Sequence, residues 1–304
     1  MISEKDYIIG IDIGGTNFRI GRVTRDKSLK DFLIISSVIL DIDSKPLGAL
    51  QHYIEGYIKK FGDGKLLAIS IGFPSAISKD KKTVYSSPNI RVLDNLNVVE
   101  FLEDIFKVPI FVDNDVNNLL MYEILKGDIE ENLSVLGFYI GTGFGNAIYI
   151  NNGIFEGKNG VAGELGHIPV IGKFDACGCG NKGCMELYAS GKRLVEINKL
   201  YFPNTRIDRV FAEHKNHEKI KELIEAISIA ICIEINIFDP DYIIVGGGVV
   251  NMDGFPKEEF EEEIYKHSRK PYPAETLDIR YADNYKGNGV LGAAYYGYEK
   301  LKKY

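Results

Sequence analysis

Three of the four cysteines in this chain lie close together, in the run Cys177-Gly-Cys-Gly-Asn-Lys-Gly-Cys184, and a histidine, His167, precedes them. Three thiolates and one imidazole form a tetrahedral Zn²⁺ ligand set, and four protein ligands close the coordination sphere, as in structural sites. The glycines between the cysteines let the loop turn tightly. The alternative is a group of buried thiols and a core histidine, but cysteines buried for apolar reasons have no cause to cluster among glycines. We therefore expect one structural zinc bound by His167, Cys177, Cys179 and Cys184.

Two glycine turns, one in each half of the chain, could hold a polyphosphate. Asp12-Ile-Gly14-Gly15-Thr16 and Gly141-Thr142-Gly143 each follow an apolar run. Glycines let a phosphate approach backbone amides closely, and Asp12 could orient Mg²⁺. The first turn is neither a dinucleotide fingerprint nor a P-loop, because it opens a strand and has no Gly-Lys-Ser/Thr. Either turn alone could be an ordinary hairpin, but two together predict a phosphate clamp.

A third glycine run, Gly246-Gly247-Gly248, follows a short apolar stretch. Glycines at this place would let a flat ring or a ribose lie against the backbone. A plain turn between a strand and a helix explains the same run equally well.

Polar residues at the junction Val112–Asn117 indicate a site for a hydroxylated ligand. Such residues are often only helix N-caps. An aspartate at a helix N-terminus is also well placed as a general base toward a sugar hydroxyl. Further amides, carboxylates and an imidazole could bind the other hydroxyls, and the chain shows no Ser-His-Asp type arrangement. The candidates are an aspartate of this junction as base and, for binding the ligand, Asn89, Asn114, Glu164, His167 and Glu186.

Composition limits the class of protein. The 304 residues are 45% hydrophobic and 26% charged, with a net charge of −7. That charge argues against a nucleic-acid partner but not against nucleotides, whose phosphates backbone amides and Mg²⁺ can hold. We see no signal peptide and no transmembrane segment, and we expect no membrane partner. Few cysteines outside the metal cluster indicate a reducing cytoplasm, with Cys232 as a core thiol.

Apolar periodicity predicts an α/β protein of two lobes with a cleft between them. Residues 1–113 would form a small lobe, onto which a final helix, 289–304, packs back, and residues 114–288 a larger lobe with the zinc site. The expected strands are 7–13, 18–23, 33–40, 66–73, 109–112, 133–140, 144–150, 241–245 and 276–281. The expected helices are 46–61 (capped near Ser44 or Lys45), 98–106, 114–125, 218–238, 256–268 and the one from 289, and 151–190 would be loops.

Taken together, these motifs resemble the ROK family of sugar kinases and repressors. The resemblance spans nearly the whole chain and rests on five segments: Asp12–Thr16, Asn114-Asp115, Gly163-Glu-Leu-Gly-His167, Cys177–Glu186 and Gly246–Gly248. It implies an actin-like, ribonuclease-H-like two-lobed fold. It also implies ATP and Mg²⁺ as co-substrates, and an aldohexose or its N-acetyl derivative as acceptor.

Residue by residue, the resemblance makes Asp115 the catalytic base. Asn89, Asn114, Glu164, His167 and Glu186 would contact sugar hydroxyls, with His167 also binding zinc. The residues that would bind the phosphates and the metal are Asp12, Gly14, Gly15, Thr16, Gly141, Thr142 and Gly143. The residues that would approach the adenosine are Gly246, Gly247 and Gly248. We also expect a homodimer.

Two departures separate the chain from many family members: Gly72-Phe-Pro-Ser-Ala76 replaces a Pro-Gly pair, and Asn17 replaces a frequent lysine. The stretches 72–89, 236–241 and 248–256 are similar to D-allose kinases. We therefore expect transfer of phosphate to the 6-hydroxyl of D-allose. A glucokinase, a mannokinase or an N-acetylhexosamine kinase is the alternative.

Two non-catalytic functions are alternatives: a transcriptional repressor and a sugar sensor without activity. A repressor needs a helix-turn-helix domain ahead of the first strand, and only six residues precede Tyr7. A sugar sensor without activity would have lost the base or the phosphate turns, whereas Asp115 and both turns are present.

Overall fold

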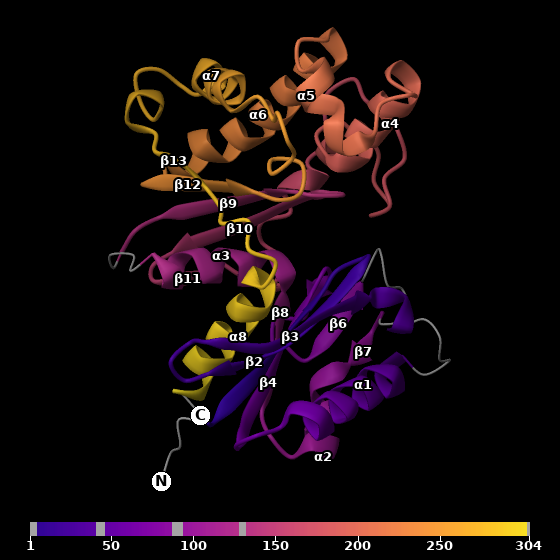
Figure 1. The fold of residues 1–304 in the computed structure, drawn as a ribbon. Coiled ribbons are helices and arrows are strands. Elements are labelled where there is room, and N and C mark those ends of the chain that lie inside the picture. Colours follow the sequence, from indigo (N-terminus) through magenta and orange to yellow (C-terminus); the bar gives the residue numbers. More distant parts are fainter. Residues whose placement is uncertain (1–4, 41–45, 87–93, 128–131, 303–304) are drawn as a thin grey trace. The chain divides into compact units, whose positions relative to one another are not determined.

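The computed structural model describes residues 5–40, 46–86, 94–127 and 132–302, and Figure 1 shows its elements. The chain divides into two compact units. Unit 1 comprises Met1–Ile129, Glu156–Ala162 and Tyr285–Tyr304; unit 2 comprises Glu130–Phe155 and Gly163–Asn284. Each unit has its own five-stranded sheet.

The sheet of unit 1 has the strand order β3-β2-β1-β4-β8. Its strands are β1 (Tyr7–Ile13), β2 (Asn17–Thr24), β3 (Leu29–Ser36), β4 (Leu66–Phe73) and β8 (Ile110–Asn114). β1 pairs with β2 antiparallel through the turn at Gly14–Thr16, whereas β1, β4 and β8 are mutually parallel. The carboxyl ends of these three strands therefore share one edge, the usual place for a ligand site in such sheets.

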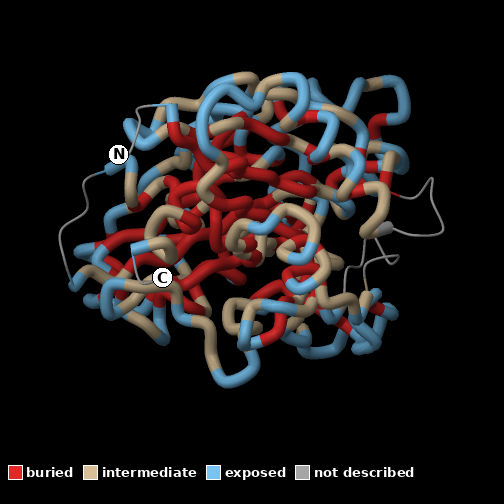
Figure 2. Tube along the Cα trace, turned by 90° about the horizontal axis from the view of Figure 1, so that it is seen from below, coloured by how far each residue is buried: buried red, intermediate tan, exposed pale blue. Residues whose placement is uncertain are grey.

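Helices cover both faces of this sheet. α1 (Pro46–Phe61) and α2 (Val98–Phe106) contribute to one apolar core together with Ile9 and Ile11 of β1. Ile8, which points to the opposite face because strand side chains alternate, packs with α3 (Asp115–Lys126) and α8 (Asn288–Leu301). β1 is buried along its whole length. Figure 2 colours the buried residues of the chain red.

Two features of unit 1 differ from the expectations. The strand expected at 33–40 begins and ends earlier, as β3, and Ser37–Leu40 forms a 3₁₀ turn. A small sheet of β5 (Ala76–Ile77), β6 (Thr83–Ser86) and β7 (Leu96–Asn97) was not predicted, because such short strands give no periodic signal. The expected cap at Ser44 or Lys45 lies outside the described residues.

Unit 2 has the strand order β11-β10-β9-β12-β13. Its strands are β9 (Val135–Ile140), β10 (Phe144–Ile150), β11 (Gly153–Ile154), β12 (Tyr242–Gly246) and β13 (Ile279–Tyr281). β9 and β10 form the second hairpin, and β12 runs parallel to β9. The helices α4 (Gly191–Tyr201), α5 (Val210–His214), α6 (Glu218–Phe238) and α7 (Lys257–His267) contribute to one core with this sheet.

The segment 151–190 consists mostly of loops, as expected, with β11 and two 3₁₀ turns, Leu165–His167 and Met185–Leu187. The expected boundary at 113/114 differs from the observed division. α3 lies in unit 1 because it packs against α8 and the strands β4 and β8. No helix within the described part of the chain is long and apolar enough to cross a membrane.

Candidate active site

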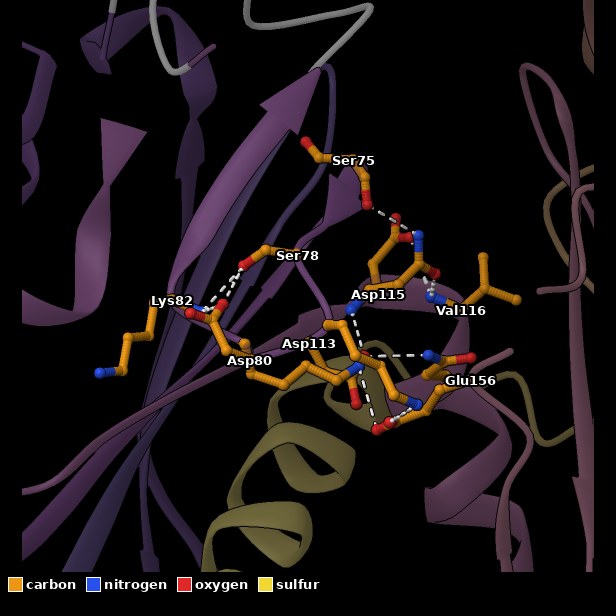
Figure 3. A network of polar contacts seen from close by, with 12 residues as sticks. Ser75, Ser78, Asp80, Lys82, Asp113, Asp115, Val116 and Glu156 are labelled. Carbon is orange, nitrogen blue, oxygen red and sulfur yellow. Dashed lines mark hydrogen bonds and ion pairs between the residues drawn. The ribbon is translucent and has the colours of Figure 1, made fainter. Parts of the chain in front are cut away.

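Asp115 is the first residue of α3 and follows β8 directly, so it lies at the carboxyl edge of the unit 1 sheet. Asn114 is the N-cap: its Oδ1 accepts a hydrogen bond from the Val116 amide at 2.8 Å, and its Nδ2 donates to the Ser75 carbonyl at 3.2 Å (Figure 3). The Asp115 Oδ1 also accepts from the Val116 amide at 2.8 Å. The backbone thus fixes both side chains, and Asn114 combines the capping role with any role toward a ligand.

Asp12, at the end of β1, lies on the same edge. Its Oδ2 accepts a hydrogen bond from Arg19 Nη1 at 2.8 Å, and Asp12 is only 9% exposed. α8 approaches from the other side, since a Cβ on Gly289 would lie 2.5 Å from the Asp12 Cγ. This crowded carboxylate has the position and charge to hold Mg²⁺ or its water shell.

The two aspartates influence each other. Burial raises the pKa of Asp12, and the Arg19 guanidinium opposes the rise. Burial and the negative charge of Asp12 together raise the pKa of Asp115 to about 8. A carboxyl group with such a pKa can hold and release a proton near neutral pH, as a general base requires.

The turn between β1 and β2 exposes backbone amides beside these carboxylates. Its closing hydrogen bond runs from the Gly14 amide to the Asn17 carbonyl at 2.8 Å. Gly15 and Thr16 are exposed, and their amides have no partner among the described residues. This part of the predicted phosphate site therefore has donors to offer an anion.

Arg19 was not among the predicted site residues. β1 and β2 pair in a register that puts Arg19 directly opposite Asp12. Cross-strand pairs of opposite charge interact across such a hairpin. The signal in the sequence was that the two residues flank the glycine turn, Asp12 two residues before Gly14 and Arg19 three residues after Thr16.

In unit 2 the second glycine turn packs against the start of α4. The Gly191 amide donates to the Gly141 carbonyl at 2.8 Å and the Lys192 amide to the Thr142 carbonyl at 3.1 Å. Gly247 has φ +96°, and a Cβ there would lie 2.5 Å from the Ile140 carbonyl oxygen, so only glycine fits. The two predicted nucleotide-binding segments, 141–143 and 246–248, are therefore neighbours.

The predicted sugar-binding acids of unit 2 adjoin this turn. A Cβ on Gly143 would lie 2.8 Å from Glu186 Oε2, so the turn and Glu186 are in contact distance. His167 Nε2 is 3.6 Å from Glu164 Oε2, and its Nδ1 is 3.7 Å from the Cys177 sulfur. One imidazole thus links a sugar-binding candidate to the cysteine cluster.

The four expected zinc ligands come together. One donor atom from each of His167, Cys177, Cys179 and Cys184 lies within 4.8 Å of all the others. The Cys179 and Cys184 sulfurs are 3.6 Å apart, close to the roughly 3.7–3.8 Å that tetrahedral Zn–S bonds impose. Burial and the neighbouring sulfurs raise the pKa of the Cys184 thiol to about 12, so a bound cation would be needed to stabilise the Cys184 thiolate. These donors fit Zn²⁺.

A buried acid supports the loop that carries Glu164. Glu234 of α6 accepts a hydrogen bond from Asn146 Nδ2 at 2.8 Å, and both residues are 6% exposed. A Cβ on Gly163 would lie 2.8 Å from the Asn146 carbonyl oxygen, so Asn146 lies under this loop. Burial raises the pKa of Glu234 from 4.5 to about 7, although the Asn146 hydrogen bond opposes the rise.

The raised pKa of Glu234 predicts a pH-dependent stability. The folded state prefers the protonated carboxyl, so this contribution is complete below about pH 4.5 and is lost as pH rises through about 7. Glu234→Gln keeps an acceptor for Asn146 and cannot ionise. We expect it to exceed the wild type in stability by about 1–3 kcal/mol at pH 9 and to match it near pH 5. Urea unfolding at both pH values measures the two stabilities. The control is Glu196→Gln, at an exposed position. A Glu234→Gln variant less stable than the wild type at pH 9 would contradict the prediction.

The predicted site residues thus fall into two groups. Asp12, the turn 14–16, Asn114 and Asp115 belong to unit 1. The turn 141–143, Glu164, His167, Glu186, the cysteines and the run 246–248 belong to unit 2. Asn89 lies outside the described residues.

The sequence profile of the ROK family matches residues 8–299. The chain belongs to the ROK family. Among its ROK relatives, the N-acetyl-D-glucosamine kinase of Vibrio cholerae is 29% identical, over 94% of this chain and 98% of the relative. A glucokinase of Halalkalibacterium halodurans is 27% identical, over 97% of this chain and 95% of the relative.

A solved structure also has this ROK fold. The glucokinase of Streptomyces griseus in complex with glucose and AMPPNP superposes with a TM-score of 0.79 at 24% identity, over 95% of this chain and 98% of that one. Xylose and N-acetylglucosamine repressors are further relatives. The expectation of a mixed α/β ROK sugar-kinase fold is therefore confirmed, and full-length relatives are sugar kinases, as predicted.

Proposed function

We propose that this protein is an ATP-dependent hexose kinase that phosphorylates the 6-hydroxyl, with D-allose as its best acceptor. One observation carries the kinase assignment: Asp115, with a pKa raised to about 8, lies on the same sheet edge as Asp12 and the exposed glycine turn. This edge combines a base, a candidate Mg²⁺ carboxylate and backbone donors for phosphate. The full-length kinase relatives support the same reaction.

The proposed reaction assigns each group a step. The amides of Gly15 and Thr16 in unit 1, and the turn 141–143 in unit 2, bind the phosphates of ATP. Asp12 would hold Mg²⁺, which would neutralise charge on those phosphates. The sugar 6-oxygen attacks the γ-phosphorus, Asp115 takes up the hydroxyl proton, and the bond to the β-phosphate oxygen breaks to release ADP.

The sugar is recognised by amide, acidic and imidazole side chains. Asn89, Asn114, Glu164, His167 and Glu186 can satisfy nearly every hydroxyl of a pyranose. A hydroxyl of the wrong orientation would leave a buried polar group unpaired, which costs about 1–3 kcal/mol. Likeness of the stretches 72–89, 236–241 and 248–256 to D-allose kinases supports allose.

A panel of hexoses tests both the kinase assignment and the preference for D-allose. With coupled detection of ADP, we expect D-allose to give the highest kcat/KM, about ten- to a hundred-fold above glucose, mannose and N-acetylated hexosamines. The comparison uses kcat/KM because KM alone mixes binding with chemistry. A tenfold advantage for another hexose would remove the allose assignment. Failure to phosphorylate any hexose would remove the kinase assignment.

A further inference from the structure

A buried carboxylate stands two residues before the proposed base. Asp113 ends β8 with its neighbour Asn114, and it is 1% exposed. Its Oδ1 accepts three hydrogen bonds: from Lys81 Nζ at 2.7 Å, from Asn117 Nδ2 at 2.9 Å and from the Asn114 amide at 2.7 Å. Figure 3 shows Asp113 between the start of α3 and the turn that carries Ser78 and Asp80. Asp113 thus connects the strand end, the helix and that turn.

The turn between β5 and β6 supplies Lys81 in a fixed conformation. The Ser78 hydroxyl donates to Asp80 at 2.6 Å and accepts from the Thr83 amide at 2.9 Å, while the Lys81 amide donates to the Ser78 carbonyl at 2.8 Å. Lys81 itself has φ +58°, a conformation that is uncommon for a residue with a side chain. Such a conformation persists only where the surroundings determine it, so this turn directs the lysine toward Asp113.

The charges around Lys81 are balanced. Lys81 Nζ is also 3.3 Å from Glu156 Oε1, and Lys79 Nζ is 3.0 Å from Glu156 Oε2. The two lysines differ in burial: the Lys81 side chain is 13% exposed and that of Lys79 is 53% exposed. Lys79 therefore shares the Glu156 contact without reaching Asp113, which makes it a matched control.

A buried ion pair is rarely kept for stability, because removing two charges from water offsets their attraction. The Lys81–Asp113 pair has another consequence here. Asp113 holds the Asn114 amide, and Asn114 in turn caps the Val116 amide, which also contacts Asp115. The direction of the Asp115 carboxylate is therefore set through this chain of hydrogen bonds.

We propose that Lys81 is a positioning residue for the reaction: through Asp113 it fixes the junction of β8 and α3 and so directs Asp115 at the acceptor hydroxyl. This inference rests on the proposed kinase function. Misplacement of a reacting group by about 1 Å can cost a factor of 100 in rate, so a residue that touches neither substrate can strongly affect turnover.

The experiment compares Lys81→Met with Lys79→Met and with the double variant Lys81→Met/Asp113→Asn. We expect Lys81→Met to lower kcat at least tenfold with KM for ATP within twofold, and Lys79→Met to resemble the wild type. Lys81→Met leaves a buried unpaired carboxylate and should also lower the melting temperature. The double variant removes that charge, so it should regain stability without regaining kcat.

A wild-type kcat in folded Lys81→Met would overturn the proposal. So would recovery of both kcat and melting temperature in the double variant, because the role would then be only structural. If the wild type phosphorylates no hexose, the proposed function fails, and amide exchange decides the positioning role separately. We expect the Asn114 and Val116 amides to exchange at least tenfold faster in the double variant than in Lys79→Met; equal rates would refute it.

Discussion

Asp115→Asn is expected to lower kcat by on the order of a hundred-fold or more while sugar affinity stays nearly unchanged. The amide retains an oxygen that can accept from the Val116 amide at the same place, so the local structure should persist. It cannot take up the proton of the attacking hydroxyl. Steady-state kinetics and calorimetric titration of the sugar measure the two quantities.

The pH profile adds a second readout for Asp115. Burial and the charge of Asp12 raise the pKa of Asp115 to about 8, so the Asp115 carboxyl is mostly ionised only above that pH. We expect the wild-type kcat/KM to rise with pH up to about pH 9 and then to level off, and the residual activity of Asp115→Asn to lack this rise. The exposed Asp104→Asn serves as the control. Turnover like that of the wild type in Asp115→Asn would assign the base to another residue.

Loss of the proposed structural zinc is expected to lower both the stability of the protein and its affinity for the sugar. Purified protein should contain one zinc per chain, and Cys179→Ser should contain much less, since one of four ligands is gone. Glu186 follows Cys184 by two residues, and His167 pairs with Glu164, so both acids that we propose to bind the sugar depend on the metal loop. We expect sugar affinity to fall about tenfold or more and the melting temperature to fall with it.

Elemental analysis, sugar titration and thermal unfolding of the same preparations test this. Cys232→Ala is the control, because Cys232 lies in the core of unit 2, where its thiol donates to the Ile264 carbonyl. It should retain the full zinc content. Wild-type protein with well under one zinc per chain would contradict the assignment.

The sequence predicted best what depends on local spacing. The three cysteines, the glycine turns and the proposed base at a strand end are short patterns whose chemistry requires close spacing. The strands β1 and β4 are nearly continuous apolar runs, and α1 and α6 have the apolar spacing of helices. The Lys81–Asp113 pair could not be predicted, because 32 residues separate the two and only the pairing of β5 with β6 directs the lysine. Likewise, the domain boundary depends on α3 packing against α8, a contact between distant segments.

The division of unit 1 into three chain segments has a consequence for synthesis. α8 covers the face of β1 and β4 that Ile8 and Ala68 line, yet it follows all of unit 2 in the sequence and is made after it. All residues of unit 2 are translated before it. On the ribosome, unit 2 can therefore complete its core while unit 1 still exposes an apolar sheet face. We expect unit 1 to be the part that needs chaperone protection during translation. A nonsense mutation just before α8 should destroy unit 1, even though all residues of its sheet and the proposed base would be present.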